Sequence, residues 1–278
     1  MNILSILLIA AIIHASWNAF LKNRGNTLNK GILLSSFISV IVFPFLFFVD
    51  LPSFHLFLYL FLSLIAHTMY IHSLARAYRL SDFSIAYPFA RGLAPLLTLL
   101  ILVLIFGKSV GLFEIIGILV IVSSIFLLLD FSKVKFKLSQ IASSLYFPLS
   151  ITFYTIVDAM GVQTAVSVEQ FVVWLFFLIP LPLLAFTLIT DKKNLIRTFV
   201  DEKKSIFIAS IGSLTSYSLV LWAYTQAPIH YVASIRESSI IFASLIGLLF
   251  FKEQGLKRRL AAAIILFIGV FLLEYVSH

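Results

Sequence analysis

Cysteine is absent from this chain of 278 residues, and charged residues make up only 12% of it. The lack of cysteine excludes disulfides and thiolate metal sites. The scarcity of charge accompanies a hydrophobic content of 61%, and the polar connections between apolar stretches are mostly 3 to 14 residues long. Connections of this length leave no room for a soluble catalytic domain, so the sequence predicts that the protein works inside a membrane.

Motifs of the common enzyme classes are missing as well. The sequence has no HExxH, no glycine-rich phosphate loop and no acidic pair at the spacing of a membrane-embedded transferase. Its six histidines are scattered singly rather than grouped as metal ligands. We therefore expect no enzymatic activity, no metal and no cofactor, and keep an intramembrane enzyme as an alternative. The net charge of +8 does not indicate a nucleic-acid partner, because the basic residues gather in loops.

Ten apolar stretches of about twenty residues follow one another along the chain, and each can cross roughly 30 Å of hydrocarbon. They cover residues 3–21, 31–49, 56–75, 84–106, 110–130, 141–161, 170–190, 205–225, 229–251 and 260–276. The sequence therefore predicts an all-α integral membrane protein, one bundle of ten transmembrane helices surrounded by the lipid bilayer.

Basic residues are distributed very unevenly between the two sets of loops. Of the 20 lysines and arginines, 17 lie in the odd-numbered connections, whereas Lys108 alone lies on the other side. The remaining two, Arg91 and Arg236, lie inside apolar stretches. Short loops rich in Lys and Arg stay in the cytoplasm. We therefore expect both termini to lie outside the cytoplasm, in a multi-pass protein of a bacterial-type inner membrane.

The chain contains a weak internal repeat. Residues 77–128 resemble residues 223–273 at an offset of about 145, and each copy places one arginine about seven residues into a span. Five spans per half is an odd number, so the two halves would be inserted upside down relative to each other. Inverted repeats of this kind build transporters whose binding site lies near the midplane. The predicted division is a first repeat, a basic linker and a second repeat at 1–130, 131–140 and 141–278.

Several short motifs carry a family resemblance. They are His14-Ala15-Ser16-Trp17-Asn18-Ala19 with Lys22, Tyr154 through Asp158 to Gly161, and Arg236-Glu237-Ser238. On these motifs the chain resembles the EamA branch of the drug/metabolite transporter (DMT) superfamily over essentially its whole length. The resemblance implies ten short spans in two inverted halves and a role in transport. Characterised relatives commonly keep both termini in the cytoplasm, whereas the loop charges predict the opposite here.

The two arginines inside spans are the strongest site candidates. A charged side chain at the bilayer centre costs roughly 2.5–3.5 kcal/mol or more, so such residues usually face the bundle interior or a wet cavity. Arg91 and Arg236 each lie roughly 10 Å from the start of their spans, which enter from opposite sides. They could bind an anion from each face in turn. The alternative is a structural ion pair of Arg236 with Glu237 or Asp158, and Arg91 is favoured for function because its neighbouring sequence has no acid.

Other polar residues in the spans are weaker candidates. His14, Trp17 and Asn18 have the spacing of one helical face, which fits either a substrate site or hydrogen bonding between helices. His67 has a mild preference for packing. Asp158 and Glu237 are candidates for coupling protons or for ion pairs. Tyrosines that could line a cavity are Tyr70, Tyr87, Tyr154 and Tyr217.

Together these features predict a secondary transporter that works by alternating access. The paired arginines favour a small polar metabolite with a carboxylate, such as an amino acid or its derivative. Export is implied by the family resemblance, and protons are a candidate coupling ion. A lipid flippase or polytopic assembly factor shares the fold and is kept as an alternative. The sequence leaves the oligomeric state open.

Overall fold

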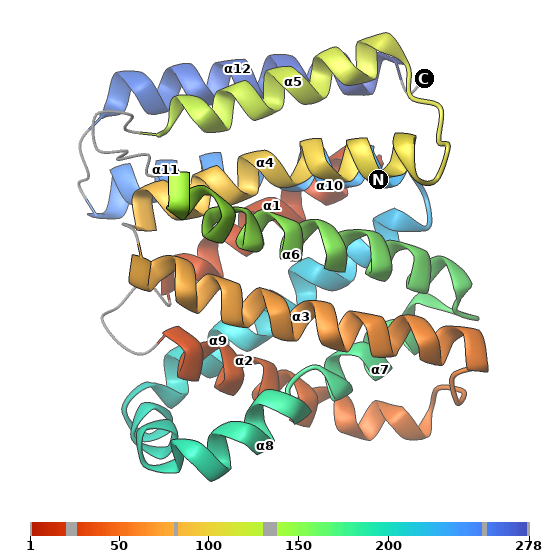
Figure 1. Ribbon diagram of the computed structural model, residues 1–278, viewed down its shortest axis with the longest axis vertical. Helices are drawn as coiled ribbons and strands as arrows, with labels where there is room; N and C mark the ends of the chain where they lie inside the picture. The colour runs from red at the N-terminus through yellow and green to blue at the C-terminus, as the bar shows by residue number, and fades with distance from the viewer. Residues whose placement is uncertain (1, 21–26, 81–82, 130–137, 252–254, 277–278) are drawn as a thin grey trace.

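The computed structural model describes residues 2–20, 27–80, 83–129, 138–251 and 255–276, and all regular structure in these ranges is helical (Figure 1). In chain order the helices are α1 (Ile3–Phe20), α2 (Thr27–Val42), the 3-10 helix η1 (Phe43–Phe47), α3 (Phe54–Leu80), α4 (Phe83–Leu104), α5 (Leu112–Leu127), α6 (Leu138–Thr164), α7 (Val168–Leu178), α8 (Leu181–Thr190), α9 (Lys192–Tyr224), α10 (Ile229–Arg236), α11 (Ser238–Phe251) and α12 (Leu256–Val276). The predicted all-α class is confirmed.

Each of the ten predicted apolar stretches lies on one helix or on two consecutive helices. Six segments of the described residues are long and apolar enough to cross a membrane. Three further apolar helices are shorter, at Ile3–Ala19, Pro88–Leu104 and Leu112–Leu127. The chain is therefore a multi-pass membrane protein, while the count of ten crossings stays a prediction.

Local sequence sets several of the helix ends. The Ser167 side chain accepts a hydrogen bond from the backbone N–H of Gln170 at 3.2 Å and caps α7. Pro228 lies in an extended conformation immediately before α10. Gly107 has a φ of 61° just after α4, a conformation that glycine adopts without a steric penalty, and the following N–H of Lys108 bonds back to the Leu102 carbonyl at 3.0 Å.

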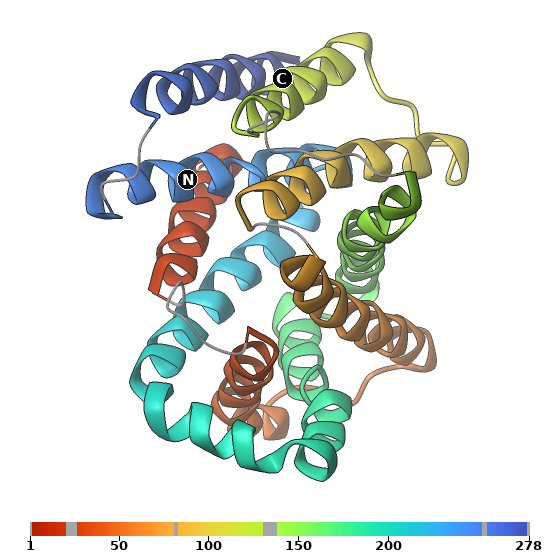
Figure 2. The same ribbon diagram turned by 60° about the vertical axis from the view of Figure 1, so that its left-hand side comes forward.

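The helices pack in pairs that resemble one another between the two parts of the chain. Helix α1 packs along α9, as α6 packs along α3, and α11 contacts α1, as α4 contacts α6. Helices α5 and α12 lie side by side at one end of the molecule (Figures 1 and 2). This pattern is what two related halves would produce. The repeat and its boundary at 131–140 stay predictions, and residues 130–137 lie outside the described chain.

Glycines allow α5 and α12 to approach closely. A Cβ atom added at Gly269 would lie 2.9 Å from the backbone oxygen of Gly117 and 2.8 Å from a side-chain carbon of Ile121. A Cβ at Gly117 would in turn lie 2.8 Å from the Leu273 side chain. Small residues permit this kind of contact between helices in a membrane, where packing replaces the hydrophobic effect as the driving force.

The two ends of the described chain meet at the same end of the bundle. The Asn2 side-chain amide donates a hydrogen bond to Glu274 at 2.6 Å, and the Tyr231 hydroxyl also donates to Glu274. Termini on the same side fit an even number of crossings. The side of the membrane on which they lie stays a prediction.

Candidate functional site

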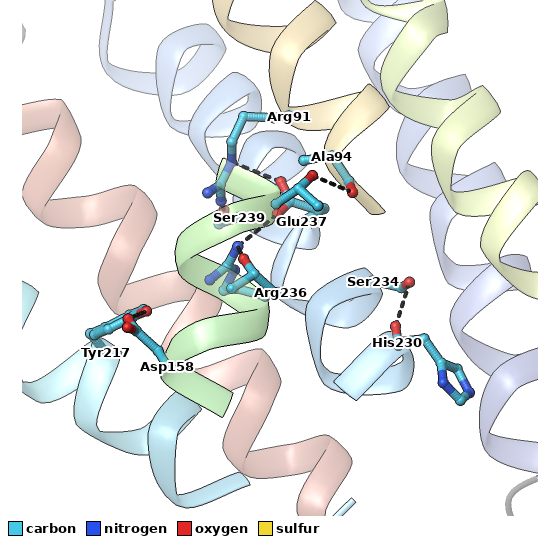
Figure 3. Close-up of polar contacts among 11 residues, drawn as sticks. Arg91, Ala94, Asp158, Tyr217, His230, Ser234, Arg236, Glu237 and Ser239 are labelled. Atoms are coloured by element: carbon cyan, nitrogen blue, oxygen red, sulfur yellow. Dashed lines mark hydrogen bonds and ion pairs between the residues drawn. The ribbon is translucent and has the colours of Figure 1, made fainter. Parts of the chain in front are cut away.

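Two arginines share one glutamate in the interior of the bundle. Arg91 Nε lies 2.7 Å from one oxygen of Glu237, and Arg236 Nη2 lies 3.5 Å from the other. All three side chains are at least 94% buried. Figure 3 shows both guanidinium groups directed at the Glu237 carboxylate. When ionised, this triad of Arg91, Arg236 and Glu237 carries one net positive charge.

A break between two helices brings the triad together. Helix α10 ends at Arg236 and α11 begins at Ser238, so Glu237 occupies the interruption. Its N–H bonds to the Ser234 carbonyl at 3.2 Å, and its own carbonyl accepts from Ile240 at 3.0 Å. Glu237 keeps right-handed helical dihedral angles (φ −68°, ψ −13°), so the interruption is a single turn of 3-10 type rather than unwound backbone.

Arg91 belongs to α4, and this helix contains one proline before Arg91 and one after it. Pro88 and Pro95 lie inside α4, which remains helical from Phe83 to Leu104. Each proline lacks an N–H and removes one backbone hydrogen bond. The Thr152 hydroxyl of α6 donates to the Ala94 carbonyl at 3.2 Å. The neighbouring helix thus supplies a hydrogen bond to the backbone of this segment.

The two guanidinium groups differ in how fully they are bonded. Arg91 also donates from Nη2 to the Ser239 hydroxyl at 3.0 Å. Arg236 Nη2 donates to the Thr155 hydroxyl at 3.2 Å, and its Cζ lies 5.4 Å from the centre of the Tyr154 ring. The other two nitrogens of Arg236, Nε and Nη1, are buried and have no hydrogen-bond partner among the described residues.

A small internal cavity lies beside the triad. Its volume is about 30 Å³. This is enough for roughly two waters. Its lining residues are Ala10, His14, Arg91, Tyr154, Ser216, Tyr217, Val220 and Arg236. The cavity is too small for a metabolite, so binding of one would require the surrounding helices to separate.

A second buried polar cluster surrounds Asp158 on α6. This fully buried carboxylate accepts hydrogen bonds from the Tyr217 hydroxyl at 2.5 Å and from the Ser63 hydroxyl. His67 Nε2 lies 2.8 Å from the same oxygen that Tyr217 contacts. The His67 ring also stacks on Tyr154, with 4.8 Å between ring centres. His67 was expected to pack rather than to bind, and Ser63 was not among the predicted site residues, although their i, i+4 spacing places them on one face of α3.

Five of the predicted substrate-binding residues line the same cavity, namely His14, Arg91, Tyr154, Tyr217 and Arg236. The others lie elsewhere. Trp17 meets the His14 ring edge-on at 4.9 Å, and the Asn18 amide donates to the His14 backbone carbonyl at 2.9 Å. Tyr70 packs against Tyr154 at 5.3 Å between ring centres.

One predicted site residue and one residue of the first-span motif fall outside what the structure describes. Tyr87 belongs to α4, but its side chain lies outside the described part, and Lys22 lies in the undescribed range 21–26.

Folding brings to Arg91 an acid that its neighbouring sequence does not contain, and which of the two arginines serves function stays a prediction. Arg91 was favoured for function because no acid lies near it in sequence, yet it makes the shorter contact with Glu237. The acid comes from the α10–α11 junction, which is 146 positions away and is brought to α4 only by folding. Asp158, the other acid considered for Arg236, is bonded instead to Ser63, His67 and Tyr217.

A bundle of apolar helices around buried charged side chains defines the class as a polytopic membrane protein. Comparison with known families identifies it more closely. Residues 139–275 match the model of the EamA-like transporter family, which belongs to the DMT superfamily. The resemblance drawn from the sequence is confirmed. The family consists of transporters, which fits the expectation that the protein is not an enzyme.

Comparison with solved structures supports the fold alone. One crystal structure has a TM-score of 0.76 to this chain and covers 97% of it and 95% of its own chain. The two sequences are only 13% identical, so the likeness says nothing about substrate. No curated protein matches the chain.

Proposed function

We propose that the protein is a secondary transporter of a small, carboxylate-bearing metabolite, that it works by alternating access, and that Arg236 binds the carboxylate. The observation that carries this proposal is that two buried nitrogens of Arg236, Nε and Nη1, have no hydrogen-bond partner among the described residues, although the side chain lines the cavity. A buried donor without a partner costs about 1–3 kcal/mol. A carboxylate is the common ligand that satisfies guanidinium donors with charge-assisted hydrogen bonds.

The two arginines have different roles in this proposal. Arg91 lies 2.7 Å from Glu237 and is neutralised by it, so its main role is to hold the carboxylate at the helix break. Arg236 has only the 3.5 Å contact to the same carboxylate. The net positive charge of the triad lies in a buried region of low dielectric, where it attracts an anion more strongly than in water.

The cavity lining favours a substrate without a free ammonium group. Among the described lining residues there is no carboxylate, because Glu237 is held by the arginines and Asp158 by its three donors. A substrate ammonium would therefore face two arginines with no counter-ion. Within the class of amino acids and their derivatives, a 2-oxo acid or an N-acylated amino acid fits better than a zwitterionic amino acid.

The proposed architecture is ten crossings in two inverted halves, 1–130 and 141–278, joined by the linker 131–140. The similar packing of α1 on α9 and of α6 on α3 supports it. Helix α4 of the first half and α10 of the second half would then deliver one arginine each to a site between the halves, as is common in such transporters. Export across an inner membrane follows from the family resemblance.

A ligand-stabilisation screen tests the site. Purified protein in detergent is heated with 2-oxo acids, N-acetyl amino acids and free amino acids, because only ligands that bind the folded state raise its Tm. We expect a carboxylate to raise the Tm of the wild type and not that of Arg236→Ala. Arg236→Lys should retain part of the shift, since lysine keeps the charge but loses the planar set of donors.

A matched control is available on α9. Arg197 is 81% exposed, and Arg197→Ala should respond to the carboxylate as the wild type does. The carboxylates that bind are then tested for transport in proteoliposomes. A wild-type Tm shift in a well-folded Arg236→Ala protein would overturn the assignment of Arg236 as the carboxylate-binding residue.

The same liposomes separate the alternative functions. A flippase would be favoured by an apolar interior, but only Ala10 and Val220 of the described lining residues are aliphatic. Movement of a fluorescent phospholipid between leaflets, with no movement of any carboxylate, would support a flippase. Chemical change of the solute would support an intramembrane enzyme.

A further inference from the structure

The Asp158 cluster contains a buried carboxylate whose positive counter-charge depends on a proton on a neighbouring imidazole. Asp158 is fully buried, and its three contacts come from two hydroxyl groups and one imidazole. The hydroxyls of Ser63 and Tyr217 can donate hydrogen bonds but carry no charge at neutral pH. His67 alone among these contacts can become positive by taking up a proton. The His67–Asp158 pair is therefore negative or neutral depending on one proton.

Aromatic side chains connect this pair to the arginine site. Tyr154 stacks on His67 at 4.8 Å and lies 5.4 Å from Arg236 Cζ. Tyr217 donates to Asp158 and also lines the cavity. The pair and the cavity are thus separated by single side chains, and a charge in one is close enough to act on the other.

Charged and titratable groups from all the neighbouring helices face this region. They are His14 on α1, Tyr154 on α6, Tyr217 and Tyr224 on α9, Arg236 on α10, Glu237 at the α10–α11 junction, and Arg91 on α4. Helix α7 contributes the Phe176 ring, 6.0 Å from Tyr217. With His67 neutral, the two arginines and the two carboxylates of Glu237 and Asp158 sum to zero.

We propose that the His67–Asp158 pair takes up one proton when a monovalent anion binds at Arg236, so that the protein carries the anion and the proton together. The proposal rests on the function proposed above. An anion alone would leave the buried site with one net negative charge, which is costly in a membrane interior. A proton on the His67 imidazole restores neutrality. By linkage, the anion and the proton each increase the affinity for the other.

The other partly buried histidine near the site is less suited to this role. His14 lines the same cavity as Arg91 and Arg236, and two cations oppose a third positive charge on its ring. His67 instead faces a carboxylate at 2.8 Å. The proposed coupling also bears on direction, because an inward proton gradient would drive the anion inward. Export by this mechanism would require an outward gradient of the substrate itself.

The test uses sodium acetate as the probe and full-length protein in detergent, where acetate cannot escape across a bilayer. Acetate is added at matched pH to weakly buffered protein that contains a pH indicator. The wild type should take up as much as one proton per acetate bound. Its acetate affinity should fall as the pH rises, with a limiting slope of about tenfold per pH unit for one linked proton.

Two variants and a control identify the proton site. His67→Gln keeps a donor to Asp158, and we expect it to bind acetate without taking up a proton. Asp158→Asn imitates the neutral pair, so its acetate affinity should be independent of pH between about pH 6 and 8, where acetate stays ionised. His72 lies on the same helix but is exposed, and His72→Gln should behave as the wild type.

The outcomes separate the two proposals. If acetate fails to shift the Tm of the wild type, the anion site is wrong and the coupling falls with it. If acetate binds to the wild type and His67→Gln takes up the same number of protons, the anion site stands and the coupling is overturned.

Discussion

Glu237 determines how the two buried arginines can be used. Its carboxylate lies between them, 2.7 Å from Arg91 Nε and 3.5 Å from Arg236 Nη2. A buried ion pair contributes little net stability, yet removal of one partner is strongly destabilising because the other charge stays buried. The unequal distances therefore separate a structural arginine from a binding arginine, although the two residue types are the same.

Arg91→Ala should destabilise the fold more than Arg236→Ala. Loss of Arg91 removes the close partner of Glu237, a change worth roughly 3–5 kcal/mol in soluble proteins, whereas Arg236→Ala leaves the 2.7 Å pair intact. Thermal unfolding in detergent measures both. The double variant Arg91→Ala/Glu237→Gln should recover much of the stability, because no ionised carboxylate is then left unpaired. Equal loss in the two single variants would contradict the assigned roles.

At the scale of elements, the positions of the helices follow from apolar length, but their interruptions do not. The stretch 229–251 was predicted as one span, and the structure divides it at Glu237 into α10 and α11. The local sequence Arg236-Glu237-Ser238 contains neither glycine nor proline, the usual signals of a break. The break coincides with contacts from α4 and α6, which a single sequence does not show. The contact of His67 with Asp158 could not be predicted for the same reason, because the two residues lie 91 positions apart in the sequence.

The contact between α5 and α12 depends on glycine at both helices. In Gly269→Ala the new methyl group would lie 2.9 Å from the Gly117 carbonyl oxygen and from the Ile121 N–H nitrogen. Backbone atoms cannot move aside individually, so the helices must separate, and overpacking of this kind costs about 1–3 kcal/mol. We expect a lower Tm in detergent for this variant.

Gly31→Ala on α2 is the matched control for this contact. A Cβ at Gly31 would meet only Ile71 Cγ2 at 3.8 Å, an ordinary contact. Because alanine also favours a helix over glycine, Gly31→Ala should unfold at the wild-type temperature or above. A wild-type Tm for Gly269→Ala would show that α5 and α12 can separate without cost.

At the scale of the whole molecule, orientation in the membrane follows from the charges of the loops. The Asn2–Glu274 contact brings both ends of the described chain to one end of the bundle, but an isolated bundle has no inside or outside. The loop charges indicate which end faces the cytoplasm. Of the 20 basic residues, 17 lie in the odd-numbered connections, and short basic loops stay in the cytoplasm. Both termini and Lys108 should therefore face away from the cytoplasm.

The absence of cysteine makes this orientation directly measurable in intact cells. Lys108→Cys and Lys203→Cys each introduce a single thiol at an exposed position, on opposite sides of the predicted topology. A membrane-impermeant maleimide added outside the cytoplasmic membrane should label Lys108→Cys and leave Lys203→Cys unlabelled until the cells are opened. Alkaline phosphatase fused after His278 should be active, since it folds only outside the cytoplasm, while a fluorescent protein at the same point should be dark. The reverse pattern in both assays would invert the assigned sides.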